Sequence, residues 1–208
     1  MTFIAVIIGM MQNKVKIAVT GGIGSGKSTV CNFIKQLGYP VFSCDRVYAE
    51  LLRSGKLTGR LVDEFGVNIL LDGKIDKSKL SECVFDDKEK LLKLNEITHT
   101  EIFKEMFLQS EKFQGAVFYE VPLLFEGNYQ NLFDEIIVVL RAVNERFLSV
   151  KFRDNLSDEE IKKRIKSQYN YDINNFAQYY VIHNNSKIDD LCDKINSILL
   201  KITQKYKL

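Results

Sequence analysis

The sequence predicts an α/β protein whose three layers are built around a five-stranded parallel sheet. Five short apolar runs alternate with segments of helical periodicity along the 208 residues. Such alternation implies right-handed crossover connections and a parallel sheet with helices on both faces. A glycine-rich stretch, residues 21–29, joins the first apolar run to the first helical segment, a junction that commonly binds anions in parallel sheets.

The first two strands and helices fill the N-terminal quarter of the chain. Residues 16–20 form an apolar run that ends at glycines, as expected of a buried parallel strand. Apolar residues at helical spacing then predict a helix that stops at Gly38. These residues are Val30, Phe33, Ile34 and Leu37. Residues 41–43 predict a second strand, and residues 45–53 predict a second helix.

Residues 58–112 are predicted to be mostly α-helical. One apolar helix face ends at Gly66 and consists of Leu61, Val62 and Phe65. A longer helix is indicated by apolar residues at helical spacing, namely Leu91, Leu94, Ile97 and Ile102. We therefore expect a helical insert, residues 45–113, between the second and third strands.

The C-terminal half supplies three more strands. They are predicted at residues 116–121, 134–140 and 179–182. Ser157 and Glu160 have the spacing of a capping box, so a helix is expected to begin there. A closing helix is expected at residues 188–202.

The composition is that of an ordinary globular protein with a hydrophobic core. Hydrophobic residues make up 46% and charged residues 27% of the chain. The net charge of +2 gives no general attraction to nucleic acid, so no nucleic-acid partner is expected. The four cysteines are scattered without a C-x-x-C pair, which argues against a zinc site and fits free thiols in a reducing cytoplasm.

The first eleven residues are apolar but too few for a membrane span, which needs about 20 residues. They also lack the basic start and the cleavage site of a signal peptide. We interpret residues 1–10 as a dispensable segment that results from an upstream start codon, with translation from Met11. The rest of the sequence offers no targeting signal or membrane span, so we expect a cytoplasmic protein without a membrane partner.

Residues 21–29 match the phosphate-loop pattern G-x-x-x-x-G-K-[ST]. The matching residues are Gly21, Gly26, Lys27 and Ser28. Glycines allow successive backbone N–H groups to turn inward around phosphate oxygens, and the following helix adds its positive dipole end. In this pattern Lys27 reaches the β- and γ-phosphates, and Ser28 offers its hydroxyl to Mg²⁺. The alternative is a glycine-rich turn without a ligand, but the flanking strand and helix favour binding of a nucleoside triphosphate.

The loop alone does not separate a kinase from other nucleotide-binding proteins. A GTPase carries a guanine-reading Asn-Lys-x-Asp segment, and residues 184–187 (Asn-Asn-Ser-Lys) lack its acid. An ABC-type ATPase needs a longer chain and a serine-glycine signature. A small kinase needs a helical insert for the acceptor and an arginine-bearing lid, and residues 45–112 and 141–170 offer both.

Several motifs together resemble those of the dephospho-coenzyme A kinase family, which completes coenzyme A synthesis. They are residues 20–29 (TGGIGSGKST), 65–66 (FG) with 72–76 (DGKID), 94–99 (LNEITH), 121–126 (VPLLFE), 164–168 (RIKSQ) and 182–184 (IHN). Several positions depart from the family pattern, among them the place of an aspartate expected before the last strand, where Gln178 or Tyr179 stands. Ser43 replaces the first acid of an Asp-Ala-Asp segment, Thr100 replaces a proline, and Ser149 replaces an arginine that precedes the lid.

The resemblance implies transfer of the ATP γ-phosphoryl group to the ribose 3′-hydroxyl of dephospho-coenzyme A, with ATP and Mg²⁺ as cofactors. The implied catalytic residues are Lys27, Asp45, Arg153 and Arg164. The implied ATP-binding residues are Gly22, Ile23, Gly24, Ser25, Gly26, Lys27, Ser28, Thr29 and Asn184. The implied substrate-side residues are Asp45, His99, Pro122, Leu123 and Glu126. Mg²⁺ would be met by Ser28 and, through water, by Glu120.

Several of these side chains could instead have a purely structural role. Asp45 could cap the helix N-terminus, and the two lid arginines could lie on a solvated helix face. Glu120 could be a charge at the end of a strand, and His99 could be a structural histidine. Glu126 is expected to brace the loop after Pro122 rather than to contact the substrate.

We expect residues 11–208 to form a single kinase domain, as a monomer or a small homo-oligomer. Its core would be residues 14–44, 114–140 and 178–208, with the helical insert at 45–113 and the lid at 141–177. Two other functions stay open: a kinase for another nucleotide or small metabolite, and a nucleotide-dependent switch without phosphotransfer. Measurement of ADP release with different acceptors separates the three.

Overall fold

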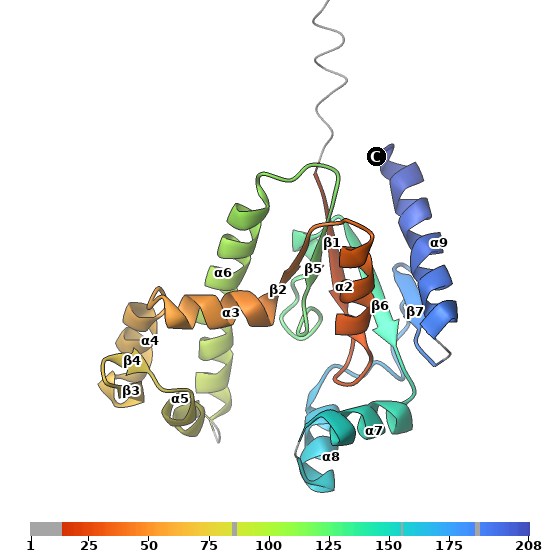
Figure 1. Cartoon of the computed structure of the whole chain (residues 1–208). Helices are drawn as coiled ribbons and strands as arrows, with labels where there is room; N and C mark the ends of the chain where they lie inside the picture. Colours follow the sequence, from red (N-terminus) through yellow and green to blue (C-terminus); the bar gives the residue numbers. More distant parts are fainter. Residues whose placement is uncertain (1–13, 85–86, 155, 186–187) are drawn as a thin grey trace, which may run out of the picture. The chain divides into compact units, whose positions relative to one another are not determined.

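The computed structural model describes residues 14–84, 87–154, 156–185 and 188–208. The chain divides into two compact units. Of the described residues, the first unit comprises 14–41 together with those from 112 to 208, and the second comprises those from 42 to 111 (Figure 1). The N-terminal segment 1–10, which we expect to be dispensable, lies outside the described residues.

A five-stranded sheet forms the body of the first unit, and its shortest strand runs over into residues 42–43 of the second. Its strands are β1 (Val15–Thr20), β2 (Val41–Ser43), β5 (Ala116–Glu120), β6 (Glu135–Leu140) and β7 (Tyr180–His183). Their order across the sheet is β2-β5-β1-β6-β7. β1 pairs in parallel with β5 and β6, and β6 pairs in parallel with β7. The predicted α/β class with a five-stranded sheet is confirmed, and each strand lies within one residue of its expected bounds.

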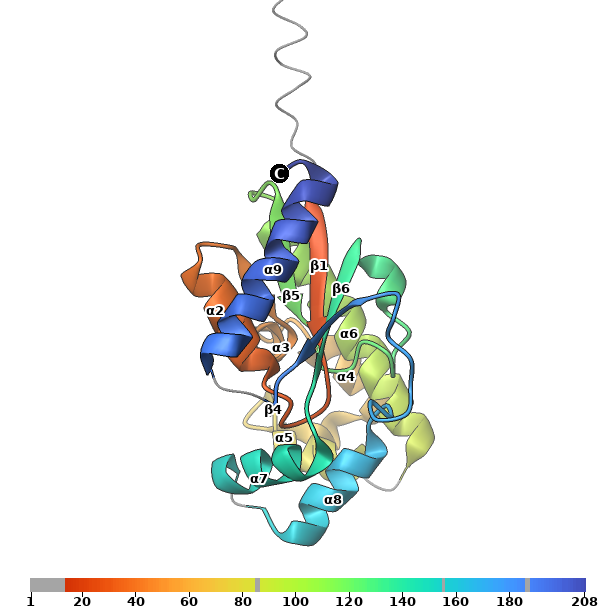
Figure 2. The ribbon, with the colours of Figure 1, turned by 90° about the vertical axis from the view of Figure 1, so that its right-hand side faces the viewer.

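One face of this sheet is covered by two helices, α2 (Lys27–Gln36) and α9 (Ile188–Tyr206). Figure 2 shows them side by side over the strands. Both helices contribute to one hydrophobic cluster with β1, β5 and β6, and α9 supplies Leu191, Ile195, Ile198, Leu199 and Ile202. Two of the residues whose helical spacing predicted α2, Val30 and Ile34, are fully buried in this cluster.

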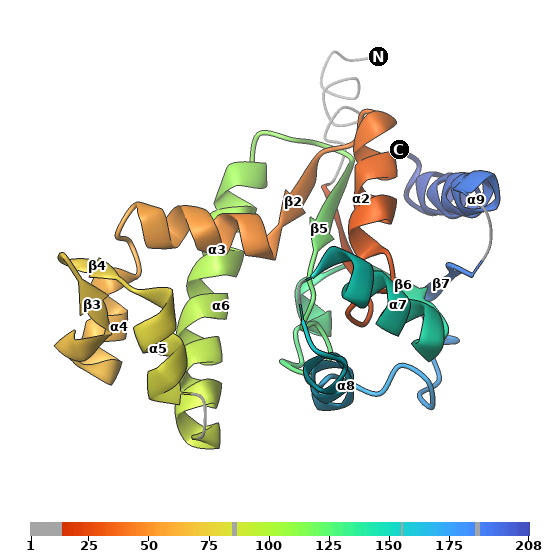
Figure 3. The same ribbon diagram turned by 60° about the horizontal axis from the view of Figure 1, so that its bottom comes forward.

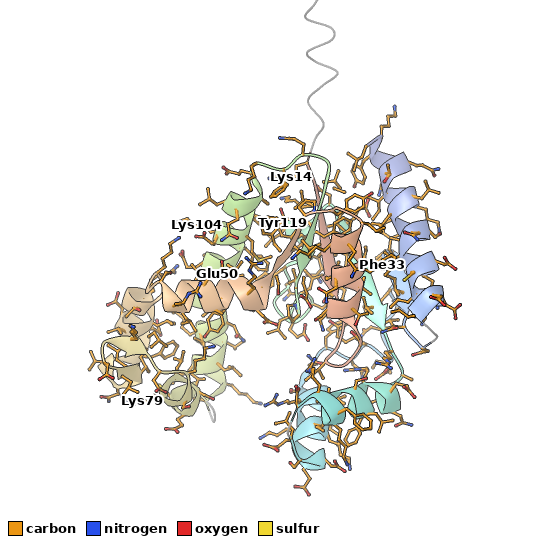
Figure 4. The ribbon with its side chains drawn as sticks, viewed as in Figure 1. Lys14, Phe33, Glu50, Lys79, Lys104 and Tyr119 are labelled. Atoms are coloured by element: carbon orange, nitrogen blue, oxygen red, sulfur yellow. The ribbon has the colours of Figure 1, made fainter. Side chains whose placement is uncertain are left out.

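The opposite face of the sheet is also apolar. Phe118 of β5 belongs to the cluster under α2 and α9. Successive side chains of a strand point to opposite faces, so Tyr119 (labelled in Figure 4) faces the other way. Tyr119 is fully buried, and its ring centroid lies 5.6 Å from that of Phe133. Burial on both faces explains why these strands are continuous apolar runs rather than alternating ones.

Two helices lie between β6 and β7 along the chain, α7 (Val143–Arg153) and α8 (Asp158–Ser167). They pack against each other, as Figure 3 shows. The predicted capping box is confirmed: the Glu160 backbone N–H donates to the Ser157 hydroxyl, and the Ser157 N–H donates to the Glu160 carboxylate. A short 3₁₀ helix, η2 (Gln130–Leu132), lies between β5 and β6.

The second unit is mostly helical, as predicted. Its helices are α3 (Cys44–Arg53), α4 (Thr58–Phe65), η1 (Val67–Ile69), α5 (Lys77–Val84) and α6 (Lys88–Ser110). Figure 4 labels Glu50 on α3, Lys79 on α5 and Lys104 on α6. Its buried side chains include Leu51, Leu57, Leu61, Ile69, Leu80 and Met106.

A two-stranded hairpin in the second unit was not predicted. β3 (Leu70–Leu71) pairs antiparallel with β4 (Lys74–Ile75). Asp72 and Gly73 form its turn with φ of 49° and 74°, the left-handed values that Asp-Gly hairpin turns adopt.

We find no helix within the described ranges that combines the length and the hydropathy needed to cross a bilayer.

Candidate active site

The phosphate-loop sequence folds into a tight turn between β1 and α2. Gly24 and Gly26 have φ of 75° and 93°, which side chains would strain, and the Ser25 N–H donates to the Gly22 carbonyl over 3.1 Å. Lys27 is the first residue of α2, and its Nζ donates to the carbonyl oxygens of Gly21 (2.7 Å) and Gly22 (3.1 Å). A glycine turn that leads into a helix N-terminus, with an ammonium group over it, is suited to hold an anion.

Two residues predicted to meet Mg²⁺ are brought together at this turn. The Ser28 hydroxyl donates to the Glu120 carboxylate over 2.7 Å. This contact follows from the sheet, because β1 pairs with β5 and Glu120 is in register with Val19. Burial, reinforced by the negative charge of Glu120, raises the pKa of the Cys31 thiol one turn along α2. Ser28 and Glu120 thus offer two oxygen ligands side by side, the type that Mg²⁺ prefers.

Asn184 contacts the phosphate loop directly. Its Nδ2 donates to the Ser25 carbonyl over 2.8 Å, and its backbone N–H donates to the Leu140 carbonyl over 2.8 Å. A Cβ added to Gly26 would lie 2.2 Å from Asn184 Nδ2, so the two segments meet closely. Asn184 therefore braces the turn from the end of β7.

Two further side chains hold the loop, and neither was in the predicted set. Arg146 of α7 is 2% exposed, and its Nε donates to the Ile23 carbonyl over 3.0 Å. Gln168, just after α8, accepts the Ile23 N–H over 2.7 Å. Burial lowers the pKa of the Arg146 guanidinium, an effect that Asp172 partly offsets. The 164–168 motif contained Gln168, but nothing in the sequence singled out Arg146.

The two predicted lid arginines lie near one carboxylate. Arg153 ends α7, and its Nε and Nη2 each donate to Asp154 over 2.8 Å. Arg164 is exposed on α8. The pKa of Asp154 is lowered, first by the hydrogen bonds from Arg153 and also by the charge of Arg164. Both guanidinium groups are at the surface and could turn toward a ligand.

The turn after β5 contains the predicted residues Pro122, Leu123 and Glu126. The Glu126 carboxylate accepts the Tyr169 N–H over 2.9 Å. The neighbouring Phe125 is 5% exposed and lies at the centre of an aromatic cluster. Its ring centroid is 5.0–6.0 Å from those of Tyr169, Tyr171, Phe176 and Tyr179. The segment 121–126 is thus joined to the chain that returns from α8.

Asp45 and His99 belong to the second unit. Asp45 is exposed in the first turn of α3, and Ser43 occupies the N-cap position, so the alternative that Asp45 is the N-cap residue is wrong. A carboxylate in the first turn still interacts favourably with the helix dipole. His99 is half-buried on α6, with its ring centroid 6.1 Å from that of Phe103, and burial lowers its pKa.

Comparison with known proteins agrees with these features. The family model described as dephospho-CoA kinase matches residues 15–190. The dephospho-CoA kinase of Listeria innocua is 38% identical over 83% of this chain and 90% of its own length. That of Carboxydothermus hydrogenoformans is 36% identical over 89% and 93%.

Two solved structures share this fold over most of the chain. Protein TT1252 of Thermus thermophilus superposes with a TM-score of 0.79 at 29% identity, covering 91% of this chain and 98% of its own. Dephospho-CoA kinase from Campylobacter jejuni superposes with a TM-score of 0.62 at 28% identity, covering 92% and 98%. The resemblance inferred from the motifs is confirmed, and the chain belongs to the dephospho-CoA kinase family.

Proposed function

We propose that this chain transfers the γ-phosphoryl group of ATP to the ribose 3′-hydroxyl of dephospho-CoA, giving CoA and ADP. The observation that carries the proposal is the phosphate loop at the start of α2 in a chain of this family. The new bond joins the 3′-oxygen to the γ-phosphorus, and the bond from that phosphorus to the β,γ-bridging oxygen breaks. The hydroxyl proton leaves as the 3′-oxygen becomes a phosphate ester oxygen.

Residues 22–29 would bind the ATP phosphates through the loop backbone and the dipole of α2. Lys27 would exchange its contacts with the Gly21 and Gly22 carbonyls for phosphate oxygens, which are stronger partners because they are charged. Its ammonium group would then offset the negative charge on the β- and γ-phosphates. Catalysis of phosphoryl transfer depends mainly on such positioning and charge neutralisation.

Asp45 would orient the acceptor hydroxyl and accept its proton. It follows β2 by two residues, and ligands of parallel α/β sheets bind beyond the carboxyl ends of the strands. Its carboxylate is exposed and therefore accessible to a substrate hydroxyl. A positioned carboxylate of this kind contributes about 10²–10⁴-fold to rate.

Ser28 and Glu120 would hold Mg²⁺, Ser28 directly and Glu120 through a water molecule. Their oxygens already lie 2.7 Å apart. Among the described residues, no group of three His, Cys, Asp or Glu side chains forms a metal site. The ATP phosphates and water would therefore complete the coordination, as is usual for Mg²⁺ in kinases. When bound, the ion would neutralise part of the negative charge on the β- and γ-phosphates.

The helices α7 and α8 would act as the lid, residues 141–177, that keeps water away from the γ-phosphate. Arg153 and Arg164 would turn from Asp154 toward the transferring phosphoryl group, where guanidinium donors match its oxygens. Asn184 would border the nucleotide through its contact with Ser25.

The helical insert, residues 45–113, is one part of the chain that we assign to dephospho-CoA binding, and the segment after β5 is another. His99 on α6 and the turn residues Pro122 and Leu123 are the side chains we assign to this role, while Glu126 would brace the turn through its bond with the Tyr169 N–H. We propose that the enzyme acts on these small metabolites in the cytoplasm. It would do so as a monomer or small homo-oligomer, without a nucleic-acid partner.

The experiment is a coupled assay of ADP release with Mg-ATP and a series of acceptors. We expect turnover with dephospho-CoA that far exceeds turnover with AMP, CMP or water. No ADP above the acceptor-free background with dephospho-CoA would overturn the proposal. Faster turnover with a nucleoside monophosphate would instead indicate a kinase for another nucleotide.

A further inference from the structure

We propose that Arg146 and Gln168 are positioning residues that hold the phosphate loop ready for nucleotide. The term loop clamp denotes these two side chains with the backbone of Ile23. The inference rests on the proposed function only for the identity of the nucleotide. Arg146 and Gln168 themselves lie outside the set of residues assigned to contact ATP.

The clamp engages both backbone polar groups of one loop residue. Gln168 Oε1 accepts the Ile23 N–H over 2.7 Å, and Arg146 Nε donates to the Ile23 carbonyl over 3.0 Å. Arg146 Nη2 also approaches Gln168 Oε1 at 3.4 Å, which joins the two side chains. The tip of the loop is therefore fixed by side chains of the α7–α8 segment.

This restraint matters because Ile23 lies between two glycines. Gly22 and Gly24 have broad conformational freedom, so a free loop would lose much entropy when it orders around phosphate. A loop that is already held avoids that cost at the moment of binding, and nucleotide affinity rises accordingly. The clamp thus acts on affinity through the loop backbone, without touching the phosphates.

The burial of Arg146 supports a specific role. Its side chain is 3% exposed, and Nη1 lies 3.9 Å from the half-exposed Asp172 carboxylate. A buried guanidinium costs free energy unless hydrogen bonds and an opposite charge compensate it. Here the compensation comes from Ile23, Gln168 and Asp172, so the charge is tied to the loop rather than solvated on the surface of α7.

Gly22 provides an independent observation. Its φ lies outside the left-handed region, so its backbone would accept a side chain. A Cβ at this position would nevertheless lie 2.3 Å from Arg146 Nη2 and 2.5 Å from Cζ. The guanidinium of Arg146 therefore occupies the space of the missing side chain. A side chain at residue 22 must push the guanidinium out of the clamp.

The primary test is ADP affinity, measured by isothermal titration calorimetry without any acceptor. Arg146→Met and Gln168→Leu should each weaken ADP binding roughly tenfold, as expected for a lost charged or buried hydrogen bond. In steady-state assays the KM for ATP should rise more than kcat falls, and the KM for dephospho-CoA should stay unchanged. Arg60→Met is the matched control: Arg60 forms an ion pair with Glu101 within the second unit, so this variant should leave ADP affinity unchanged.

Two further variants separate positioning from charge and from stability. Arg146→Lys keeps the charge but lacks the planar fork, so it should stay as weak as Arg146→Met. Gly22→Ala should weaken ADP binding by displacing the guanidinium. Because both changes disrupt the same clamp, the double variant Gly22→Ala/Arg146→Met should bind ADP no more weakly than the weaker of the two single variants. Recovery of affinity in Arg146→Lys, or additive losses in the double variant, would overturn the clamp.

Folding is checked by circular dichroism and thermal melting of each variant. If Arg146→Met does not fold, Gln168→Leu at the half-buried end of α8 carries the test. If the folded variants bind ADP within about twofold of wild type, the inference is overturned, because a lost clamp hydrogen bond is expected to weaken binding roughly tenfold. A wild-type chain that binds ADP but shows no turnover with dephospho-CoA would contradict the proposed function and leave the clamp result valid.

Discussion

Two backbone carbonyls, those of Gly21 and Gly22, hold the Lys27 ammonium group over the phosphate loop. Lys27→Ala removes the ammonium group while leaving the loop glycines and α2 intact. We predict a loss of kcat of at least about 10²-fold, the effect of removing a preorganised charge that meets the transition state. Circular dichroism should match wild type. A folded variant that keeps most of its activity would contradict the role of Lys27.

Asp45 is exposed at the start of α3 and has no structural task as an N-cap, since Ser43 occupies that position. Asp45→Asn keeps the shape of the side chain but not its basicity. We predict that kcat falls about 10²–10⁴-fold, the range for a lost general base, while ATP affinity is unchanged. Calorimetry of nucleotide binding beside steady-state kinetics checks this. An equal loss in both quantities would place Asp45 in binding instead.

His99 makes stability depend on pH. Burial lowers its pKa from 6.5, so the unfolded chain binds a proton there more readily than the folded chain does. Its contribution to stability is complete above pH 6.5 and is lost as the pH falls from 6.5 through the lowered pKa. The melting temperature should therefore drop more between pH 7.5 and pH 5.5 in wild type than in His99→Gln. His183, the other histidine, is present in both proteins, so any effect it has on the melting temperature is common to both.

Ser28, Glu120 and Asn184 could be selected from the sequence because a motif and strand order bring them together. The order of parallel strands places Glu120 beside the loop, and the structure finds it 2.7 Å from Ser28. Arg146 could not be selected in this way. Its partner Ile23 lies 123 residues away along the chain, and the sequence around Arg146 alone would predict an exposed arginine on a helix. Burial of that charge is decided only when α7 packs on the loop.

The aromatic cluster around Phe125 joins the turn after β5 to the segment after α8. Phe125→Ala should cost about 3–5 kcal/mol in the free energy of unfolding, because it leaves a cavity among packed rings. Phe152→Ala is the control: Phe152 is 87% exposed, and its removal should change stability by less than about 0.5 kcal/mol. Urea unfolding of both variants measures the difference. Equal effects would show that the cluster does not stabilise the fold.

The central strands β5 and β6 were predictable because burial on both faces makes each of them a continuous apolar run. The hairpin of β3 and β4 was not, because each strand has two residues and shows no periodicity. Only the Asp72-Gly73 turn indicates it. The capping box of α8 was predictable from Ser157 and Glu160, since its contacts are local in sequence.

The whole chain combines a phosphate-loop unit with a separate helical unit, residues 42–111. The loop could be assigned from its own sequence, since its chemistry lies within nine residues of chain. The acceptor could not, because no single motif specifies it. It was inferred from a set of short motifs spread over the chain, and the family match across residues 15–190 now supports it. Activity toward dephospho-CoA is therefore the claim on which the account depends.

The most direct measurement combines the purified chain with Mg-ATP and dephospho-CoA and identifies both products. We predict ADP and CoA in equal amounts, with phosphorus NMR locating the new phosphate on the ribose 3′-oxygen, and neither product with Lys27→Ala. ADP without CoA, or a phosphate at another position, would contradict the proposed function.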